Sequence, residues 1–382
     1  MSIAWVIIVT CIVIFCQSFL YDRLGLKKIL YSRTFSQSSV FEGENIEMVD
    51  EISNKKWLPL PWIRLESKIH RHLQFESKKK QDDELEETEF HRTLFSLRPY
   101  QKITRRHKIT CVKRGYYALH TVSMSTGDVL GFNEKFKTVD SSATITVYPA
   151  LVDVEAIPLP SHSWLGDITV RRWIIEDPFV IAGVREYADG DSLNTINWKA
   201  TARSNRLQVS QKDYTADHYL MIYVNFDQTE DIWMPIENER LIEKALSFAA
   251  SIANYTIANG ISTGFGCNAY LKEPFSNPTE RTKESVRLEP ESGMDQIYFI
   301  LDTIAKLKMD RSRNFNYFLL EDIENQVRNK DILLITSIVS DEMKSNIRQL
   351  EAMGNAVEII MVDDESQVEN SYEPSEVGGY YG

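Results

Sequence analysis

The pattern of hydrophobic and polar residues changes twice along the chain. Residues 3–20 are almost wholly apolar and carry no charge. Residues 34–150 contain short stretches in which polar and apolar residues alternate, such as 144–148, and this alternation is typical of half-buried strands. From residue 219 onward, continuous apolar runs are separated by amphipathic stretches. The pattern predicts an apolar N-terminal helix, a β domain and a C-terminal α/β domain.

The first apolar segment has the length of a membrane-spanning helix, for which about 20 apolar residues are needed. No basic side chain precedes it, and the basic residues that follow it are Arg23, Lys27, Lys28 and Arg33. An excess of positive charge after the helix predicts that the C-terminal side lies in the cytoplasm. The alternatives are a buried soluble helix and a cleaved signal peptide, which would need a charged start and a small-residue cleavage site. We expect an uncleaved, single-pass anchor in the cell membrane with a cytoplasmic body.

Several short segments before residue 150 have the composition of strands. Residues 46–49, 103–112 and 116–122 are examples. The last two flank the sequence Lys-Arg-Gly at residues 113–115, which is typical of a hairpin turn. Many short strands at this spacing predict a β-sandwich.

Two further segments of this region are less regular. Residues 57–62 combine tryptophan with Pro59 and Pro61, and because proline cannot donate to a ladder, we expect an edge strand or a crossing loop. Residues 78–89 form a block of charged side chains, which favours a solvated hairpin tip or a flexible insertion.

Three apolar runs in the last third of the chain predict buried strands. They are residues 219–226, 332–335 and 357–362. Continuous apolar runs suit strands that are covered on both faces of a parallel sheet. The alternation of such strands with helices implies βαβ units and a doubly wound sheet.

Two amphipathic helices are expected between these strands. Their apolar faces recur at steps of three and four and consist of Leu241, Ala245, Phe248, Ile252 and Tyr255 in one helix, and of Ile297, Leu301, Ile304 and Leu307 in the other. Gly260 follows the first helix at the position where a C′ glycine commonly ends a helix.

The segment 184–209 is a dense mixture of charged and aromatic residues that fits neither an amphipathic helix nor an alternating strand. Within it, residues 189–192 (Asp-Gly-Asp-Ser) are a turn signal. Residues 195–202 suit a short helix, and Leu207 and Val209 suit the start of a strand.

This segment contains the spaced pattern R-x-Y-x-x-G-D-x-x-x-x-I-x-W-x-x-x-A-R. The residues that form it are Arg185, Tyr187, Gly190, Asp191, Ile196, Trp198, Ala202 and Arg203. The pattern resembles the signature of the family called domain of unknown function 58. The resemblance implies a membrane-anchored protein whose C-terminal domain is similar to a von Willebrand factor A domain. It also implies a setting beside MoxR-type AAA+ ATPases, which are thought to remodel or mature other proteins.

Domains similar to von Willebrand factor A often hold a divalent cation after their first strand, at a D-x-S-x-S pattern with a Thr and an Asp from later loops. Here Asp227 is in place, Thr229 could replace the first Ser, and Asp231 stands for the second. Ser337 stands where a further carboxylate is expected. Mg²⁺ prefers hard oxygen ligands such as carboxylates. We therefore expect no complete metal site and no cofactor.

The signature residues admit three interpretations. In the structural one, Asp191 caps the turn from 193 to 202, Trp198 fills a domain junction, and Arg185 and Arg203 pair with Asp189 and Asp191 through bidentate bonds. In the second, the same groups reach solvent and form a surface for a partner. In the third, they take part in catalysis.

Composition and motifs restrict the classes of function that we expect. The net charge of −12 argues against nonspecific nucleic-acid binding, which depends on basic residues that neutralise phosphates. The sequence has no G-x-S-x-G, no H-E-x-x-H and no P-loop. We therefore expect a noncatalytic scaffold or adaptor at the cytoplasmic membrane, acting with a MoxR-type AAA+ ATPase in protein assembly or maturation. The alternative is a hydrolase of unknown substrate that uses Asp191 or Asp227.

The expected organisation has five parts. They are a transmembrane anchor at 1–21, a β-sandwich at 34–150, a connector with the signature at 151–216, an α/β domain at 217–363 and a disordered tail at 364–382.

Overall fold

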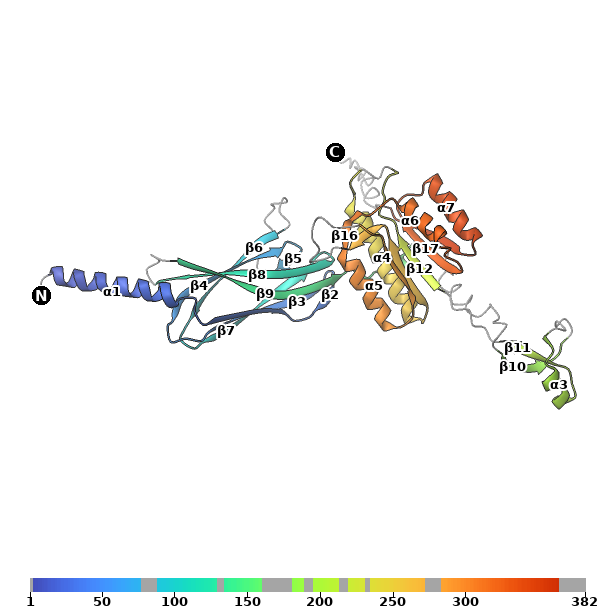
Figure 1. The fold of residues 1–382 in the computed structure, drawn as a ribbon, viewed down its shortest axis with the longest axis horizontal. Helices are drawn as coiled ribbons and strands as arrows, with labels where there is room; N and C mark the ends of the chain where they lie inside the picture. Colours follow the sequence, from blue (N-terminus) through green and yellow to red (C-terminus); the bar gives the residue numbers. More distant parts are fainter. Residues whose placement is uncertain are drawn as a thin grey trace, which may run out of the picture. The chain divides into compact units, whose positions relative to one another are not determined.

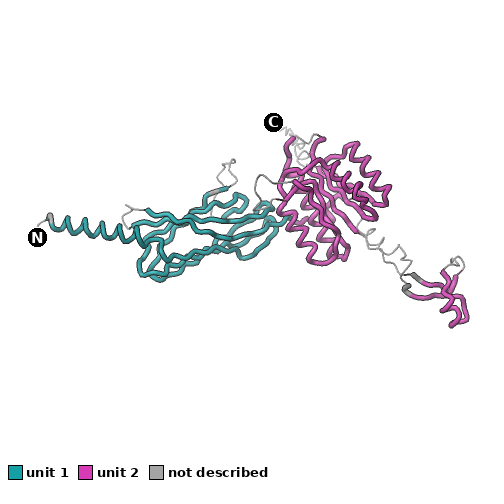
Figure 2. Tube along the Cα trace, viewed as in Figure 1, with its two compact units in different colours: residues 1–150 teal, residues 151–382 magenta. Residues whose placement is uncertain are grey.

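The computed structural model describes most of the chain, with gaps. The described residues are 3–76, 88–128, 134–159, 181–188, 195–212, 219–230, 234–271 and 283–363. The chain divides into two compact units, residues 1–150 and residues 151–382 (Figure 2). Most of the charged block at 78–89 and the expected tail at 364–382 lie outside the described residues.

The first unit begins with helix α1 (Ile3–Leu24), which runs four residues beyond the apolar segment expected from the sequence (Figure 1). Its stretch Trp5–Leu24 has a mean hydropathy of 1.9, and only 6% of that stretch is buried. Large apolar side chains such as Phe15, 74% exposed, therefore face outward. By length and composition, α1 is suited to be a membrane anchor or a signal sequence.

The C-terminal end of α1 is bonded to the β domain. Lys56 is buried, and its Nζ donates to the carbonyl oxygens of Leu24 (2.7 Å), Lys27 (3.2 Å) and Gly25. A lysine at a helix C-terminus satisfies carbonyls that have no partner within the helix. Burial lowers the pKa of Lys56 to about 8, so most of the ammonium groups stay charged at pH 7. The helix end and the loop that carries Lys56 are thereby held together.

The β domain consists of two sheets. One sheet has the order β1 (Ile29–Phe35), β3 (Asn45–Asn54), β7 (Lys102–Cys111), β5 (Leu73–Phe75). The other has the order β2 (Ser39–Phe41), β9 (Glu134–Tyr148), β8 (Gly115–Gly127), β4 (Leu60–His70), β6 (Thr88–Leu97). All named pairs are antiparallel except β2 with β9.

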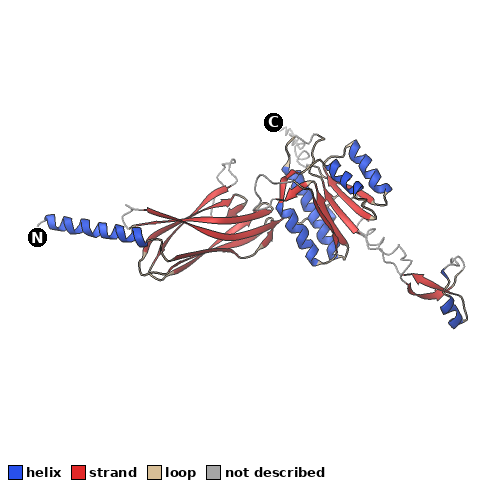
Figure 3. Cartoon of the chain, in the orientation of Figure 1, coloured by secondary structure: helices blue, strands red, loops and turns tan. Residues whose placement is uncertain are grey.

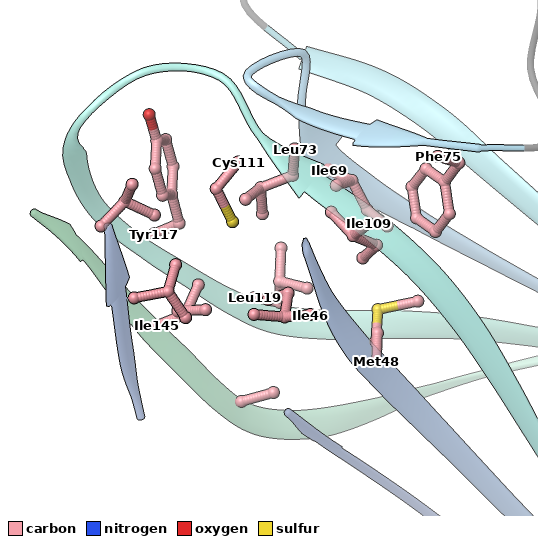
Figure 4. Packing of buried hydrophobic residues seen from close by; sticks show 13 residues of the cluster. Ile46, Met48, Ile69, Leu73, Phe75, Ile109, Cys111, Tyr117, Leu119 and Ile145 are labelled. Carbon is pink, nitrogen blue, oxygen red and sulfur yellow. The ribbon is translucent and has the colours of Figure 1, made fainter. Parts of the chain in front are cut away.

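Side chains from both sheets meet in a common core (Figure 4). Along β3 every second residue is buried, so Ile46 and Met48 point inward. They share one cluster with Ile109 of β7 and with Leu119 and Ile145 of the other sheet. Fully burying such a side chain contributes about 1.5–3 kcal/mol to folding. The expected sandwich of two sheets is therefore what the residues before 150 form.

The expected hairpin across residues 113–115 is wrong. β7 pairs with β3 and β5, whereas β8 pairs with β4 and β9, so the turn carries the chain from one sheet to the other. The physical reason is that an alternating pattern marks a buried face but does not identify the neighbouring strand.

Of the two expectations for the proline segment, the crossing loop is confirmed for residues 55–59, which carry the chain from β3 of one sheet to β4 of the other, and the edge strand is wrong. β4 lies between β6 and β8, inside its sheet. Pro61 is tolerated there because the register with β6 shifts between Leu60 and Ile63, where the ladder is irregular.

A buried ion pair lies inside the sandwich. Arg33 of β1 donates to both carboxylate oxygens of Asp50 on β3, with distances of 2.7 and 3.0 Å, and to Ser67 Oγ of the other sheet at 2.8 Å. The hydroxyl of Tyr31 also donates to Asp50 at 2.7 Å. The Arg33 and Asp50 side chains are each 1% exposed. Burial alone would raise the pKa of Asp50, but the hydrogen bonds and charge of Arg33 prevail and hold the pKa of Asp50 below its ordinary value.

The second unit contains a mixed sheet. Its order is β15 (Val286–Glu291), β13 (Ser262–Cys267), β12 (Tyr219–Val224), β17 (Lys330–Thr336), β18 (Ala356–Met361). The four strands from β13 to β18 are parallel, whereas β15 runs antiparallel to β13. The expectation of a parallel doubly wound sheet is therefore correct for its centre and wrong for this edge.

Helices cover both faces of this sheet (Figure 3). The helices are α4 (Glu239–Ala258) and α5 (Met294–Lys306) on one face, and α6 (Phe315–Glu324) and α7 (Asp341–Ala352) on the other. Smaller elements of the unit are η1 (Val154–Ala156), β14 (Ala269–Leu271) and β16 (Leu307–Arg311). Met221 and Tyr223 of β12 pack against Phe315 and Phe318 of α6, which fixes the start of that helix beside the strand.

The helix faces predicted from the sequence are largely confirmed. Ile297, Leu301 and Ile304 of α5 are buried, and Leu307 is the first residue of β16. In α4, Ala245, Phe248 and Ile252 are buried, whereas Tyr255 is 41% exposed. Gly260 has a φ of +76° just after α4, as expected of a C′ glycine.

The buried ion pair generates a stability prediction. Asp50→Ala leaves the guanidinium of Arg33 buried without its carboxylate, and we expect the free energy of unfolding of the β domain to fall by roughly 3–5 kcal/mol. Amide hydrogen exchange in β1 and β3 measures this change without interference from the other unit.

The matched control is Glu47→Ala on the same strand. Glu47 pairs with Arg106 at 3.4 Å on the surface, and we expect its loss to cost about 0–1 kcal/mol. Equal effects of the two substitutions would contradict the role given to Asp50.

The difference in the free energy of unfolding between the parent and Asp50→Ala should also depend on pH. Because the pKa of Asp50 lies below its unfolded value of about 3.9, the pair stabilises the fold above that pH, and this contribution is lost as the pH falls through the folded pKa.

Candidate functional site

The signature segment folds into a small module. β10 (Ile181–Glu186) pairs antiparallel with β11 (Gln208–Lys212), and Ile196 forms a bridge with Val209. Helix α3 (Trp198–Ser204) lies between the two strands in sequence. The short helix and the following strand predicted from the sequence are therefore confirmed, with boundaries shifted by a few residues.

Asparagines set both ends of α3. The side-chain oxygen of Asn197 accepts from the Ala200 amide at 3.1 Å, and Asn197 Nδ2 donates to Ser210 Oγ of β11 at 3.2 Å. Asn205 ends the helix in the left-handed conformation, with a φ of 58°. Asparagine is favoured at both positions because its short side chain bonds nearby backbone and tolerates positive φ. The cap of α3 is thus Asn197. Asp191, which the structural interpretation expects to cap the turn from 193 to 202, lies outside the described residues.

Two signature residues, Gly190 and Asp191, lie outside the described residues, as does Asp189. The expected pairs of Arg185 and Arg203 with these aspartates therefore stay predictions. Both arginine side chains are exposed.

The side chains of α3 form a surface that combines charge with an aromatic ring. Trp198, expected to fill a domain junction, is 68% exposed. Lys199, Ala202 and Arg203 of the same helix are exposed as well. We call these four residues the α3 surface. Tyr187 and Ile196, in contrast, are half-buried, and the Tyr187 amide donates to the carbonyl oxygen of Leu207 at 2.9 Å. The signature residues thus include half-buried side chains inside the module and the exposed side chains of the α3 surface.

The second candidate site lies after β12, where Asp227 is 4% exposed. Its Oδ1 accepts from Asn268 Nδ2 at 3.0 Å and lies 3.4 Å from Nη1 of Arg311. Its Oδ2 accepts from the backbone amide of Phe315 at 2.7 Å, at the first residue of α6. Burial raises the pKa of Asp227, although the Phe315 amide, Arg311 and Asn268 each favour the charged form. Both carboxylate oxygens are therefore engaged by donors of the fold.

Two asparagines that follow strands hold this arrangement in place. Asn225 Oδ1 accepts from the Asp227 amide at 2.8 Å, and its Nδ2 donates to Thr336 Oγ1 at 3.0 Å. Asn268 Oδ1 accepts from the Phe226 amide at 2.9 Å. Sequence reasoning missed these residues and Arg311. The available signal was an asparagine directly after each of two buried strands, at the edge where the strands meet.

The residues around Asp227 do not fit a divalent cation. The guanidinium of Arg311 provides the positive charge next to the carboxylate. Ser337 Oγ lies 3.5 Å from the backbone carbonyl oxygen of Asp227 and adds no carboxylate, and Asp231 lies outside the described residues. Within the described ranges, no cluster of three or more His, Cys, Asp or Glu side chains has the geometry of a metal site. Mg²⁺ prefers hard oxygen ligands such as carboxylates, but both oxygens of Asp227 already accept hydrogen bonds from the fold.

A cavity of about 280 Å³ opens beside Asp227, at the ends of β12 and β17. Thr229, Glu230, Asn316, Asp341 and Glu342 are among the side chains that line it. Asn316 is 8% exposed and donates through Nδ2 to Glu342 at 2.9 Å, while its Oδ1 has no hydrogen-bond partner among the described residues. The lining is thus rich in acceptor oxygens and in carboxylates, which favours a ligand or partner group with N–H donors.

The environment of Asp227 predicts how the protein responds to metal. A calorimetric titration of the full chain with Mg²⁺ or Mn²⁺ is expected to show no saturable binding up to millimolar concentration, since Arg311 already compensates the carboxylate. Asp227→Ala is the matched control. A one-to-one isotherm in the parent that disappears in Asp227→Ala would overturn the assignment.

Comparisons with known proteins agree with the signature. The family described as "Protein of unknown function DUF58" matches residues 183–369. The "Uncharacterized protein YeaD" of Bacillus subtilis (strain 168) is 23% identical over 275 residues, which cover 71% of this chain and 63% of the relative. The alignment thus spans less than two thirds of the relative's own length.

Among solved structures, the chain has local similarity to a PapD-like domain of human CEP192, with 15% identity over 31% of this chain and 86% of that one, and a TM-score of 0.19. A non-cellulosomal cohesin from Archaeoglobus fulgidus is 12% identical over 31% of this chain and 90% of that one, with a TM-score of 0.21. Scores this low support no argument about fold or function. The family match covers most of the signature module and the whole α/β domain, so residues 183–369 form a DUF58 family domain.

Proposed function

We propose that this protein is a membrane-anchored, noncatalytic adaptor whose second unit binds a protein partner at the cytoplasmic face of the membrane. In this proposal α1 is an uncleaved, single-pass anchor. Its apolar surface supports insertion, and the basic residues Arg23, Lys27 and Lys28, which follow without a counterpart before the helix, support a cytoplasmic body.

The α/β domain, in the same proposal, is similar to a von Willebrand factor A domain. A central set of parallel strands with helices on both faces supports this likeness. Asp227 stands after the first strand of the sheet, at the edge where such domains often hold a cation. Here Arg311 neutralises this carboxylate, so partner binding at this edge would need no metal ion.

The observation that carries the proposal is the exposure of the α3 surface. Tryptophan and arginine are the residues most enriched at binding hot spots, and here Trp198 and Arg203 are both exposed on one short helix. Exposing the large ring of a tryptophan to water is unfavourable in free energy, and packing against a partner's surface would remove this exposure. The partner that fits the family setting is a MoxR-type AAA+ ATPase.

The competing function, hydrolysis with Asp191 or Asp227, has weaker support. A general base or nucleophile needs an oxygen within reach of its substrate. Both oxygens of Asp227 accept hydrogen bonds from Asn268 and Phe315, and the side chain is 4% exposed. The raised pKa of Asp227 is accounted for by burial.

The adaptor proposal predicts the effect of truncating the α3 surface. We expect Trp198→Ala and Arg203→Ala each to weaken capture of the ATPase by about 2 kcal/mol or more, which is roughly thirtyfold in Kd. Neither substitution should lower the melting temperature appreciably, because both side chains are exposed. Pull-down titrations and thermal melts of the same full-length samples measure the two effects.

Arg206→Ala is the control for loss of a positive charge in the same module. Arg206 is 73% exposed and pairs with Glu186 at 3.0 Å, but it is not part of the signature, so binding should change by no more than about 1 kcal/mol. If Trp198→Ala and Arg203→Ala bind the ATPase as the parent does, the α3 surface is not its docking site.

A further inference from the structure

The end of the β domain that receives α1 gathers loops that are far apart in sequence. Lys56, in the loop between β3 and β4, donates to the carbonyls at the end of α1. The Lys55 amide donates to the Lys28 carbonyl oxygen at 3.0 Å, and the Tyr100 amide, from the loop between β6 and β7, donates to the Lys56 carbonyl oxygen at 3.2 Å. Figure 1 shows α1 meeting this end of the domain.

The start of β9 joins the same end through an ion pair. Lys135 lies 3.2 Å from Asp22 of α1. The strand registers also bring these segments to one end of the domain, since Ile29 pairs with Asn54 and Gly127 pairs with Glu134. We call this end of the domain the rim and define it by residues 22–28, 55–59, 98–102 and 134–137.

The rim carries a surplus of positive charge. Its acidic residues are each engaged, Asp22 by Lys135 and Glu134 by Arg64 at 2.7 Å. Among the other basic residues, Lys56 is buried and Lys102 lies 2.8 Å from Glu51. The rest are exposed and have no ion pair among the described residues. They are Arg23, Lys27, Lys28, Lys55, Arg98 and Lys137.

Exposed aromatic side chains accompany these charges. Trp57 is 59% exposed, Tyr100 is 70% exposed and Phe136 is 66% exposed, and each comes from a different loop or strand end of the rim. Protein segments at a membrane–water interface are enriched in aromatic and basic side chains. The rings lie at the level of the headgroups, and the lysines approach acidic lipids.

The length of α1 places the rim at the height of the headgroups. About 20 residues of helix cross the hydrocarbon core, which uses most of Ile3–Leu24. Tyr21, one helical turn before the end, is already buried to 8% exposure in the first unit. At about 1.5 Å per residue, only a few ångströms of helix remain between the hydrocarbon and the loops of the rim.

We infer that the rim is a second membrane-binding surface, which lies against anionic lipid headgroups around the point where α1 enters the bilayer. This inference rests on the proposed anchor and adds that the β domain itself is held at the membrane surface. The ligand is an anionic phospholipid, recognised through the rim lysines and arginines and through the three aromatic rings.

The test measures how quickly individual lysines react with a membrane-impermeant acylating reagent. The full-length chain is inserted into nanodiscs of phosphatidylcholine alone or of phosphatidylcholine mixed with phosphatidylglycerol, and labelling is quantified by mass spectrometry. Lys27, Lys28, Lys55 and Lys137 are expected to react several-fold more slowly in the anionic discs. Raising the salt from about 0.1 M to about 1 M should remove the difference, because it shortens the screening length to about 3 Å.

Lys68 and Lys108 are internal controls on strands of the same domain. Lys108 lies six residues beyond the start of β7, roughly 20 Å along the strand from the rim. Both controls should react equally in the two kinds of disc. Equal reactivity of the rim lysines in both discs, or an equal decrease in rim and control lysines, would overturn the inference. A chain that leaves the discs on washing would instead defeat the proposed anchor, so the two failures are distinguishable.

Discussion

The α/β domain depends on one buried carboxylate. Asp227 connects the end of β12 with Asn268 after β13, with Arg311 at the end of β16 and with the first amide of α6. A buried charge is costly unless it is paired and hydrogen-bonded, and removing one partner of such a group leaves the others unsatisfied. The edge of the sheet is therefore organised by the protein's own donors. The adjacent cavity is lined by further carboxylates, those of Glu230, Asp341 and Glu342.

The first unit depends on polar contacts of the same kind. Arg33 and Asp50 join β1 to β3, and the bond from Arg33 to Ser67 reaches the second sheet. Lys56 fixes the end of α1 to the same domain through three backbone carbonyls. A transmembrane helix that ends in this way would not be joined to its domain by a flexible linker. The position of the β domain at the membrane would follow from the helix.

The sequence predicted those parts of the fold that follow from burial. The apolar runs form β12 and β17, which are buried because helices cover both faces of their sheet, and β18, which lies at the edge of the sheet and is mostly half-buried. Gly260 ended α4 because a residue with positive φ was needed there. The direction of β15 and the sheet change between β7 and β8 could not be predicted, because strand pairing is decided by contacts between distant residues. Asp50 was also missed, since its partner Arg33 lies 17 residues away and only the folded sheet brings them together.

In the candidate sites, too, local features could be predicted from the sequence and contacts between distant residues could not. The spacing of the signature located α3 and its exposed Trp198, but the helix cap was Asn197, which lies outside the pattern. Asp227 was found from its place after a strand, whereas Arg311 is 84 residues away and was not foreseen. Charged residues that pair across so many positions of the chain leave no local signal in a single sequence. The rim, likewise, is assembled from loops that only the strand registers bring together.

The central claim is that the body of the protein lies in the cytoplasm, where an ATPase partner can reach it. Its most direct test is to treat intact cells with a protease that cannot cross the membrane and to probe residues 34–382 for cleavage. The account predicts that this part stays uncut in intact cells and is cut once the membrane is permeabilised. Rapid cleavage in intact cells would contradict the orientation, and with it the proposed partnership.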